Sequence, residues 1–271
     1  MSDSNINEVA KSLLSKNPVK TLPAHPKRVR ILLHDQYVVD TVDAVYVWEH
    51  EYYPVYYLPR KDFIKDALEI LDGDTFIGKN GQRVSFAKLG QGGQGHVVLV
   101  VRRSGDDDDE MVRVPVNTGT WFEEEESMEG GHPKDPFKRV DVLFSSRCIR
   151  VFWKGTTDVV LAESRGGAWH LYETGLPVRF YLPRTAVKPG VLKESEKGTR
   201  TRCPYKGEAG YFDVVVGEGE GEEKRVRDGV WFYENPKSEC GAVKGCLCFY
   251  NEKFDIELDG KLLERPKTKF S

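Results

Sequence analysis

The sequence concentrates its most reactive side chains in residues 201–211, T-R-C-P-Y-K-G-E-A-G-Y. This segment brings the thiol of Cys203, the phenol of Tyr205 and the ammonium of Lys206 close together along the chain, and its proline and glycine favour a turn. Because a nearby cation stabilises a thiolate, Cys203 is the predicted nucleophile or redox centre and Lys206 a predicted proton carrier. The alternative is a tight turn around a buried structural cysteine.

Basic residues flank this segment at Lys197, Arg200 and Arg202, although the whole chain is acidic. Such a local positive field favours binding of a small polar molecule that carries negative charge. Ordinary solvated loop charges would give the same pattern, so both interpretations stay open.

A second candidate segment is E-T-G-L-P-V-R-F-Y-L-P-R, residues 173–184. Strand alternation from Glu173 places Tyr181 on the same face, and Arg184 follows directly after the strand. Glu173 is therefore a third predicted catalytic residue, and Tyr181 and Arg184 are predicted to bind ligand. Equally, Glu173 and Arg184 could form a structural ion pair with each other.

Four further aromatic residues could supply flat surface for a ligand: Tyr205, Trp231, Tyr233 and Tyr250. Aromatic rings bind planar or cationic groups well, but they fill cores more often. For Trp231 the core interpretation is favoured, while all four are kept as predicted ligand-binding residues.

The sequence predicts no metal and no cofactor. Cys240, Cys246 and Cys248 follow a C-x5-C-x-C spacing without the paired C-x2-C knuckles of a zinc site, and the second half of the chain has His170 as its single histidine. The chain also lacks G-x-S-x-G and the G-x4-GK[ST] phosphate loop. The glycine run at residues 89–96 is interpreted as a linker or hairpin.

Composition narrows the classes of partner. The chain has 271 residues, a formal net charge of −3 and a sequence pI near 6.1, which argue against general nucleic-acid binding. It has neither the start of a signal peptide nor a long apolar run, so we expect a cytoplasmic protein that does not enter membranes, with five reduced cysteines. The acidic runs SGDDDDE and GEGEGEE are interpreted as solvated turns and not as calcium sites. The oligomeric state is not predicted.

Internal similarity indicates two copies of one domain. Residues 49–60, E-H-E-Y-Y-P-V-Y-Y-L-P-R, match residues 173–184 without a gap at five positions, which include Glu49 with Glu173 and Tyr57 with Tyr181.

Two weaker matches follow in the same order. Residues 118–125 resemble residues 228–235, which would make Trp121 the counterpart of Trp231, and residues 137–142 resemble residues 251–256.

Between these landmarks, short alternating apolar and polar stretches bounded by glycine, proline and aspartate predict strands. The predicted strands are residues 29–33, 44–48, 96–101, 111–116, 148–152, 211–216, 224–226, 247–250 and 253–258. Helical periodicity appears at residues 5–15 and 61–71. The expected fold class is mostly β, with two tandem small antiparallel two-sheet domains and a short N-terminal helix. The expected division is a partly helical extension at 1–26, a diverged first domain at 27–146 and a second domain at 147–271.

The segments at 173–184, 201–211, W-F-Y-E-N-P and C-F-Y-N-E-K-F-D-I together resemble the domain-of-unknown-function family 427 in its tandem form. The resemblance covers nearly all of the second copy, chiefly through C-P-Y-K-G, and covers the first more weakly. It implies a β-tent fold of two antiparallel sheets, related to methionine sulfoxide reductase B and to the ligand-binding domain of cereblon. Some relatives bind zinc through paired cysteines that this chain lacks, and no paired-aspartate motif supports the nucleotidyltransferase label that the family also carries.

The first copy lacks a counterpart of the C-P-Y-K-G thiol and phenol. The sequence therefore predicts a small-molecule pocket in the second domain and a largely structural first domain. Two alternatives remain: a cysteine-dependent enzyme that uses the same pocket, and a protein-interaction scaffold without chemistry.

Overall fold

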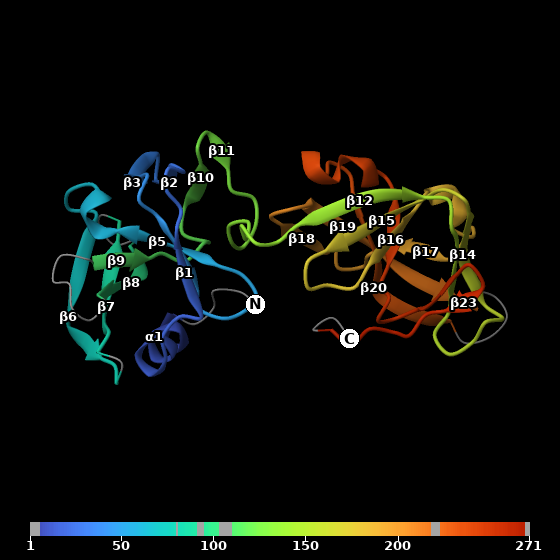
Figure 1. Cartoon of the computed structure of the whole chain (residues 1–271), viewed down its shortest axis with the longest axis horizontal. Coiled ribbons are helices and arrows are strands. Elements are labelled where there is room, and N and C mark those ends of the chain that lie inside the picture. Colours follow the sequence, from blue (N-terminus) through green and yellow to red (C-terminus); the bar gives the residue numbers. More distant parts are fainter. Residues whose placement is uncertain (1–5, 80, 91–94, 103–109, 218–222, 269–271) are drawn as a thin grey trace. The chain divides into compact units, whose positions relative to one another are not determined.

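A computed structural model describes residues 6–79, 81–90, 95–102, 110–217 and 223–268, without the side chains of 72–74. The chain divides into two compact units, Met1–Asp135 and Pro136–Ser271, and each holds a larger and a smaller antiparallel sheet (Figure 1). The expected fold class, mostly β with two tandem two-sheet domains and a short N-terminal helix, is confirmed.

The larger sheet of the first domain has the strand order β1-β4-β5-β9-β8-β7-β6, and the smaller has the order β11-β10-β2-β3. The strands of the first domain are β1 Lys20–Pro23, β2 Val29–Leu33, β3 Gln36–Thr41, β4 Val45–Trp48, β5 Val55–Pro59, β6 Leu68–Ile77, β7 Arg83–Leu89, β8 His96–Arg102, β9 Glu110–Arg113, β10 Thr120–Glu123 and β11 Glu126–Ser127. The α-helix α1, Ile6–Ser15, precedes them, and a 3-10 turn η1, Arg60–Asp62, follows β5.

The second domain repeats this order as β12-β15-β16-β21-β20-β19-β17, with β18 on β19, and as β14-β13-β22-β23. Its strands are β12 Val140–Ser145, β13 Cys148–Phe152, β14 Val160–Arg165, β15 Ala168–Glu173, β16 Arg179–Leu182, β17 Leu192–Glu194, β18 Arg200–Cys203, β19 Gly207–Val216, β20 Lys224–Tyr233, β21 Leu247–Phe249, β22 Asp255–Leu258 and β23 Lys261–Leu262. Its 3-10 segments include η3, Arg184–Ala186, and η4, Ser238–Val243.

Strand order identifies the true counterparts in the two domains. The gapless match of 49–60 with 173–184 places β5 on β16, and η1 and η3 follow at the same point. The match of Trp121 with Trp231 is wrong: Trp121 lies on β10 of a smaller sheet, whereas Trp231 lies on β20 of a larger one. The match of 137–142 with 251–256 is wrong for the same reason, because these residues lie at β12 and around β22.

The compact units meet eleven residues before the expected boundary, since the first unit ends at Asp135 and the expected first domain at residue 146. Val140–Ser145 pairs along its whole length with Ala168–Glu173, so β12 belongs to the second domain. Strand β1 lies within residues 1–26, which were expected to be an extension. It pairs with β4 at the edge of the larger sheet of the first domain, so it belongs to that domain.

The helix expected at 61–71 is absent from these described residues. Asp66 has a φ of 64°, a left-handed conformation that interrupts a right-handed helix. Leu68 then begins β6, which pairs with β7. Most of the two acidic runs, residues 104–109 and 218–222, and residues 91–94 of the glycine run at 89–96 lie outside the described residues.

Each larger sheet is buried on both faces, because its strands send alternate side chains to a core between the sheets and to a second core on the outer face. In the first domain α1 covers the outer face, where Ala10 and Leu13 pack with Tyr57 and Leu99. In the second domain η4 takes that place, and Cys240 and Val243 are packed into the outer core. None of the helices in the described part of the chain combines the length and the apolar character that crossing a bilayer requires.

Candidate functional site

A tight turn between β18 and β19 positions the Cys-Pro-Tyr-Lys segment. Cys203 and Gly207 are paired across this hairpin. Gly207 has a φ of +97°, and a Cβ there would lie 3.2 Å from the carbonyl oxygen of Asn235, so the position requires glycine. The carbonyl of Lys206 accepts a hydrogen bond from the backbone N–H of Lys237 at 3.1 Å. The turn is therefore fixed against the segment that leads into η4.

Lys206 forms an ion pair with Glu173, whose side chain comes from the end of β15. The two side chains are only 13% and 8% exposed, so the pair is largely shielded from water. Burial acts to lower the pKa of the Lys206 ammonium, but the nearby Cys203 and Glu173 outweigh burial and raise that pKa. Lys206 therefore carries its charge at neutral pH.

Two cysteines lie beside this ion pair. Cys203 is partly exposed, whereas Cys240 on η4 is buried. Burial raises the pKa of the Cys240 thiol to about 11, against the opposing effect of Lys206. We call Cys203, Lys206, Glu173 and Cys240 the Lys206 cluster; within it, Cys203 is the cysteine open to solvent.

Aromatic side chains pack in the outer core together with Cys240. Tyr181 is fully buried, and its hydroxyl accepts a hydrogen bond from Trp231 Nε1 at 2.9 Å. Burial raises the pKa of Tyr181 and of Tyr233 well above the usual tyrosine value. The ring of Tyr250 lies 4.4 Å from that of Trp231. Trp231 and Tyr181 are therefore side chains of the outer core. Tyr205 is also buried, within the turn.

Arg184 lies away from the cluster. Its guanidinium is 5.4 Å and 5.3 Å from the ring centroids of Phe212 and Phe232. Phe232 packs in the core between the sheets, while its neighbour Trp231 packs in the outer core, so Arg184 lies on the opposite face of the sheet. The predicted convergence of Glu173 and Arg184 is therefore wrong, and Glu173 pairs with Lys206 instead.

Two of the flanking basic residues, Arg200 and Arg202, make surface ion pairs. Arg202 lies 3.2 Å from Glu208, and Arg200 lies 3.9 Å from the same carboxylate. Exposed pairs of this kind contribute little. Lys206 differs from these two arginines in that its ion pair is shielded from water.

A second buried ion pair, which the sequence did not indicate, lies on the same outer face. Arg179 donates two hydrogen bonds of 2.7 Å to Glu252, and the Arg179 guanidinium is 5.5 Å from the Trp231 ring centroid. Thr268 adds a hydrogen bond of 2.6 Å to the same carboxylate. The residues are 73 positions apart, so only the fold could reveal the pair.

In the first domain the equivalent glutamate, Glu49, has different hydrogen-bond partners. Glu49 accepts a hydrogen bond of 3.0 Å from the Tyr57 hydroxyl and one of 3.1 Å from Arg113 Nε. Arg113 lies opposite Tyr57 on the neighbouring strand, and Cys248 lies opposite Tyr181 in the same way. The first domain therefore has an arginine at the position where the second has a cysteine. Glu49 is thus held by the side chains of two neighbouring strands.

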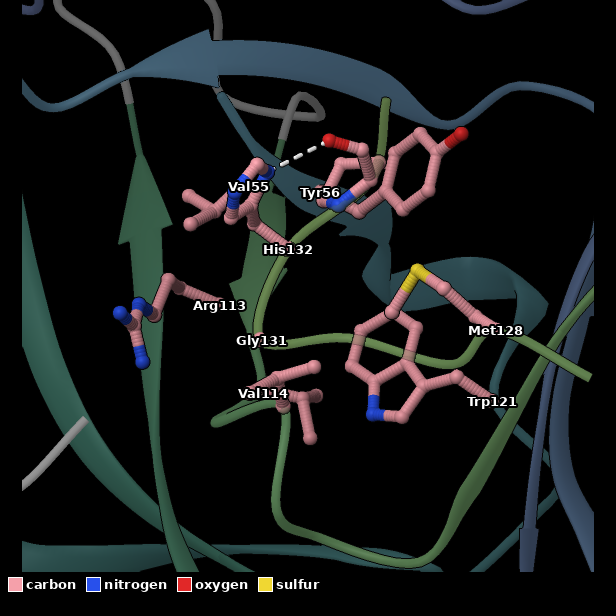
Figure 2. Close-up of a pocket in the computed structure, with 10 residues that line it drawn as sticks. Val55, Tyr56, Arg113, Val114, Trp121, Met128, Gly131 and His132 are labelled. Atoms are coloured by element: carbon pink, nitrogen blue, oxygen red, sulfur yellow. Dashed lines mark hydrogen bonds between the residues drawn. The ribbon is translucent and has the colours of Figure 1, made fainter. Parts of the chain in front are cut away.

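The first domain also contains a pocket, which the sequence did not predict. It has an empty volume of about 240 Å³, part of it open to solvent, and its lining includes Val55, Trp121, Met128 and His132 (Figure 2). The His132 Nδ1 atom lies 2.7 Å from the carbonyl oxygen of Pro133. The walls are mostly apolar, so this pocket offers few groups for chemistry.

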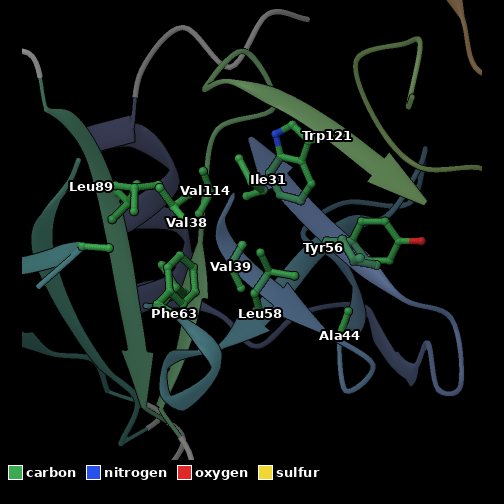
Figure 3. Close-up of a cluster of buried hydrophobic side chains, with 14 of the residues drawn as sticks. Ile31, Val38, Val39, Ala44, Tyr56, Leu58, Phe63, Leu89, Val114 and Trp121 are labelled. Carbon is green, nitrogen blue, oxygen red and sulfur yellow. The ribbon is translucent and has the colours of Figure 1, made fainter. Parts of the chain in front are cut away.

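Trp121 belongs to the core between the sheets as well as to this pocket. Figure 3 shows its indole beside Ile31, above the ring of Tyr56, whose centroid lies 6.4 Å away. Its role is consistent with packing. Across the described ranges, no three histidine, cysteine, aspartate or glutamate side chains are grouped as a metal ion would require.

A family model described as a domain of unknown function, DUF427, matches residues 21–92 and 141–260. The two matches together cover well over half of the chain, one in each domain. No curated protein matches the chain.

Proposed function

The chain belongs to the DUF427 family, and from this premise we propose that its second domain binds a small polar molecule of negative charge at the Lys206 cluster. The observation that carries the proposal is the shielded Lys206–Glu173 pair beside the partly exposed Cys203. A buried ion pair is weak evidence for stability, because desolvation offsets its Coulomb attraction. A role in recognition gives a reason for its presence.

The hydrogen-bonding capacity of the pair supports ligand binding. An ammonium has three N–H donors, and Glu173 accepts a bond from the Lys206 ammonium. An acidic group of a ligand can accept a further one. In the first domain, by contrast, Glu49 is bound by both Tyr57 and Arg113.

The surroundings strengthen such an interaction. Charges attract more strongly where water is excluded, and Lys206 is 13% exposed. Cys203 at the edge of the cluster leaves an approach from solvent.

A thermal-shift screen against small carboxylates and phosphates tests the proposal. A true ligand present at about 100 times its Kd adds about 2.7 kcal/mol to the stability of the domain that binds it. The double variant Lys206→Met with Glu173→Gln removes both charges, leaves no unpaired partner, and should abolish the shift.

The first domain provides the matched control, Glu49→Gln with Arg113→Met, which should leave the ligand-induced shift unchanged. A shift that survives loss of Lys206 and Glu173, or one that depends on Glu49 and Arg113, contradicts the proposal. A library in which no compound stabilises the protein also counts against it.

A further inference from the structure

We propose that Cys203, Lys206 and Glu173 form a catalytic set for acyl transfer, in which Cys203 accepts the acyl group of a small ester or amide as a thioester. The inference rests on the proposed function, because the substrate must reach the same cluster.

The geometry brings a nucleophile, a cation and a base into one place. Cys203 and Lys206 stand at the two ends of one tight turn, and Lys206 is ion-paired with Glu173 from a neighbouring strand. Lys206 interacts electrostatically with both Cys203 and Glu173. Tyr233 interacts with the same two residues. The hairpin turn therefore holds Cys203 near the Lys206–Glu173 pair.

The three groups suit a two-step reaction. In the first step the Cys203 sulfur attacks the acyl carbon, and Glu173 accepts the thiol proton. Lys206 stabilises the negative charge on the carbonyl oxygen as the tetrahedral intermediate forms. The bond from carbon to the leaving group then breaks, Glu173 returns the proton to that group, and the thioester remains.

In the second step water attacks the thioester carbon while Glu173 accepts one of its protons. The carbon–sulfur bond breaks, the carboxylic acid leaves, and the proton returns to the Cys203 sulfur. The net reaction consumes one ester or amide and one water, and it requires no oxidant or reductant.

Cys240 and Cys248, which lie in the outer core, do not meet these requirements. Cys240 and Cys248 are fully buried, and burial raises the pKa of Cys240 to about 11. A thiol of that kind is almost entirely protonated at neutral pH. Cys203 combines exposure to solvent with an adjacent ammonium.

The test uses the full-length protein and p-nitrophenyl acetate. The wild type should release a burst of p-nitrophenolate equal to the protein concentration, and peptide mapping should find an acetyl thioester on Cys203. Glu173→Gln removes the base of both steps, so it should slow both the formation and the hydrolysis of the thioester by about 100-fold. Lys206→Met should slow its formation at least about tenfold, whereas Lys206→Arg, which keeps the cation, should restore much of the rate.

Three controls separate the possible failures. Glu49→Gln, at the equivalent position of the first domain, should change neither step, and thermal unfolding reports whether each variant is folded. If iodoacetamide labels Cys203 but no thioester forms, or if Lys206→Met and Glu173→Gln react like the wild type, acyl transfer is overturned while the binding proposal stands. If iodoacetamide does not reach Cys203 in the folded protein, the site is closed and both proposals fail.

Discussion

Two buried ion pairs lie on the outer face of the larger sheet of the second domain. Lys206–Glu173 lies beside a partly exposed thiol, whereas Arg179–Glu252 is enclosed, with its carboxylate side chain 0% exposed. The first pair belongs to the proposed ligand site. The second is placed to hold the chain segment around Glu252 against Trp231.

We predict that Glu252→Gln lowers the free energy of unfolding of the second domain by about 3–5 kcal/mol, because it leaves the Arg179 charge buried without its partner. Urea unfolding at neutral pH measures the loss. Glu163→Gln, which removes a carboxylate from the exposed pair with Arg165, is the matched control and should change little. A loss below about 1 kcal/mol for Glu252→Gln would contradict the assignment.

His170 makes stability depend on pH. It is 3% exposed, its Nε2 atom has no hydrogen-bond partner among the described residues, and burial together with Arg147 lowers its pKa from 6.5. The unfolded chain then binds the proton more readily than the folded one. The stability associated with a neutral His170 is present above pH 6.5 and falls as the pH drops toward the lower pKa of the folded state.

The expected result is a lower free energy of unfolding at pH 5.5 than at pH 7.5, and a smaller difference in His170→Phe. Urea titrations at the two pH values measure both proteins. An equal pH dependence in wild type and variant would show that His170 is not the group responsible.

At the scale of elements, the two domains cover equivalent sheet faces with different segments. The first uses α1, and the second uses η4 together with the turn after β18. The sequence indicates α1 by its periodicity. It does not indicate η4, because a short 3-10 segment without a repeating apolar pattern has no strong signal.

We predict that Leu13→Ala destabilises the first domain by about 2–5 kcal/mol, because Leu13 is 3% exposed in the core under α1. Lys11→Ala, on the exposed side of the same helix, should have almost no effect. Chemical unfolding of the two variants gives the comparison. Equal effects would mean that α1 does not dock on the sheet as described.

Element by element, strand prediction succeeded where apolar alternation was strong, as for Val29–Leu33 and Cys148–Phe152. It failed at 61–71, where the apolar spacing resembles a helix but Asp66 at positive φ and the pairing of β6 decide the structure. The counterpart of Trp121 was mistaken because similar strand sequences occur in both kinds of sheet. Sequence similarity between two strands does not show which strands they pair with.

At the scale of the whole molecule, each hydrophobic core formed by the described residues lies within a single unit. We therefore predict that fragments 1–135 and 136–271 each unfold cooperatively alone. A fragment of residues 147–271 should be markedly less stable, because it lacks β12 and its pairing with β15. Circular dichroism during thermal unfolding measures the stability of each fragment. Equal stability of fragments 136–271 and 147–271 would place the domain boundary after residue 146, as expected from the sequence.

The site could be predicted only in part. Cys203 and Lys206 are local in sequence, so the turn was recognisable, and Glu173 was found through the repeat. The partnership of Lys206 with Glu173 depends on the packing of the turn against β15 and η4, which no spacing reveals. Arg184 was misplaced because it follows its strand and turns to the other face of the sheet.

The most direct test of the account is the rate at which iodoacetamide alkylates Cys203 at pH 7, compared between the wild type and Lys206→Met with Glu173→Gln. Loss of both the ammonium and the carboxylate that would accept the thiol proton should slow alkylation of Cys203 about tenfold or more, although the sulfur becomes no less exposed. Equal rates in the two proteins would contradict the central claim that Lys206 and Glu173 make Cys203 a functional group.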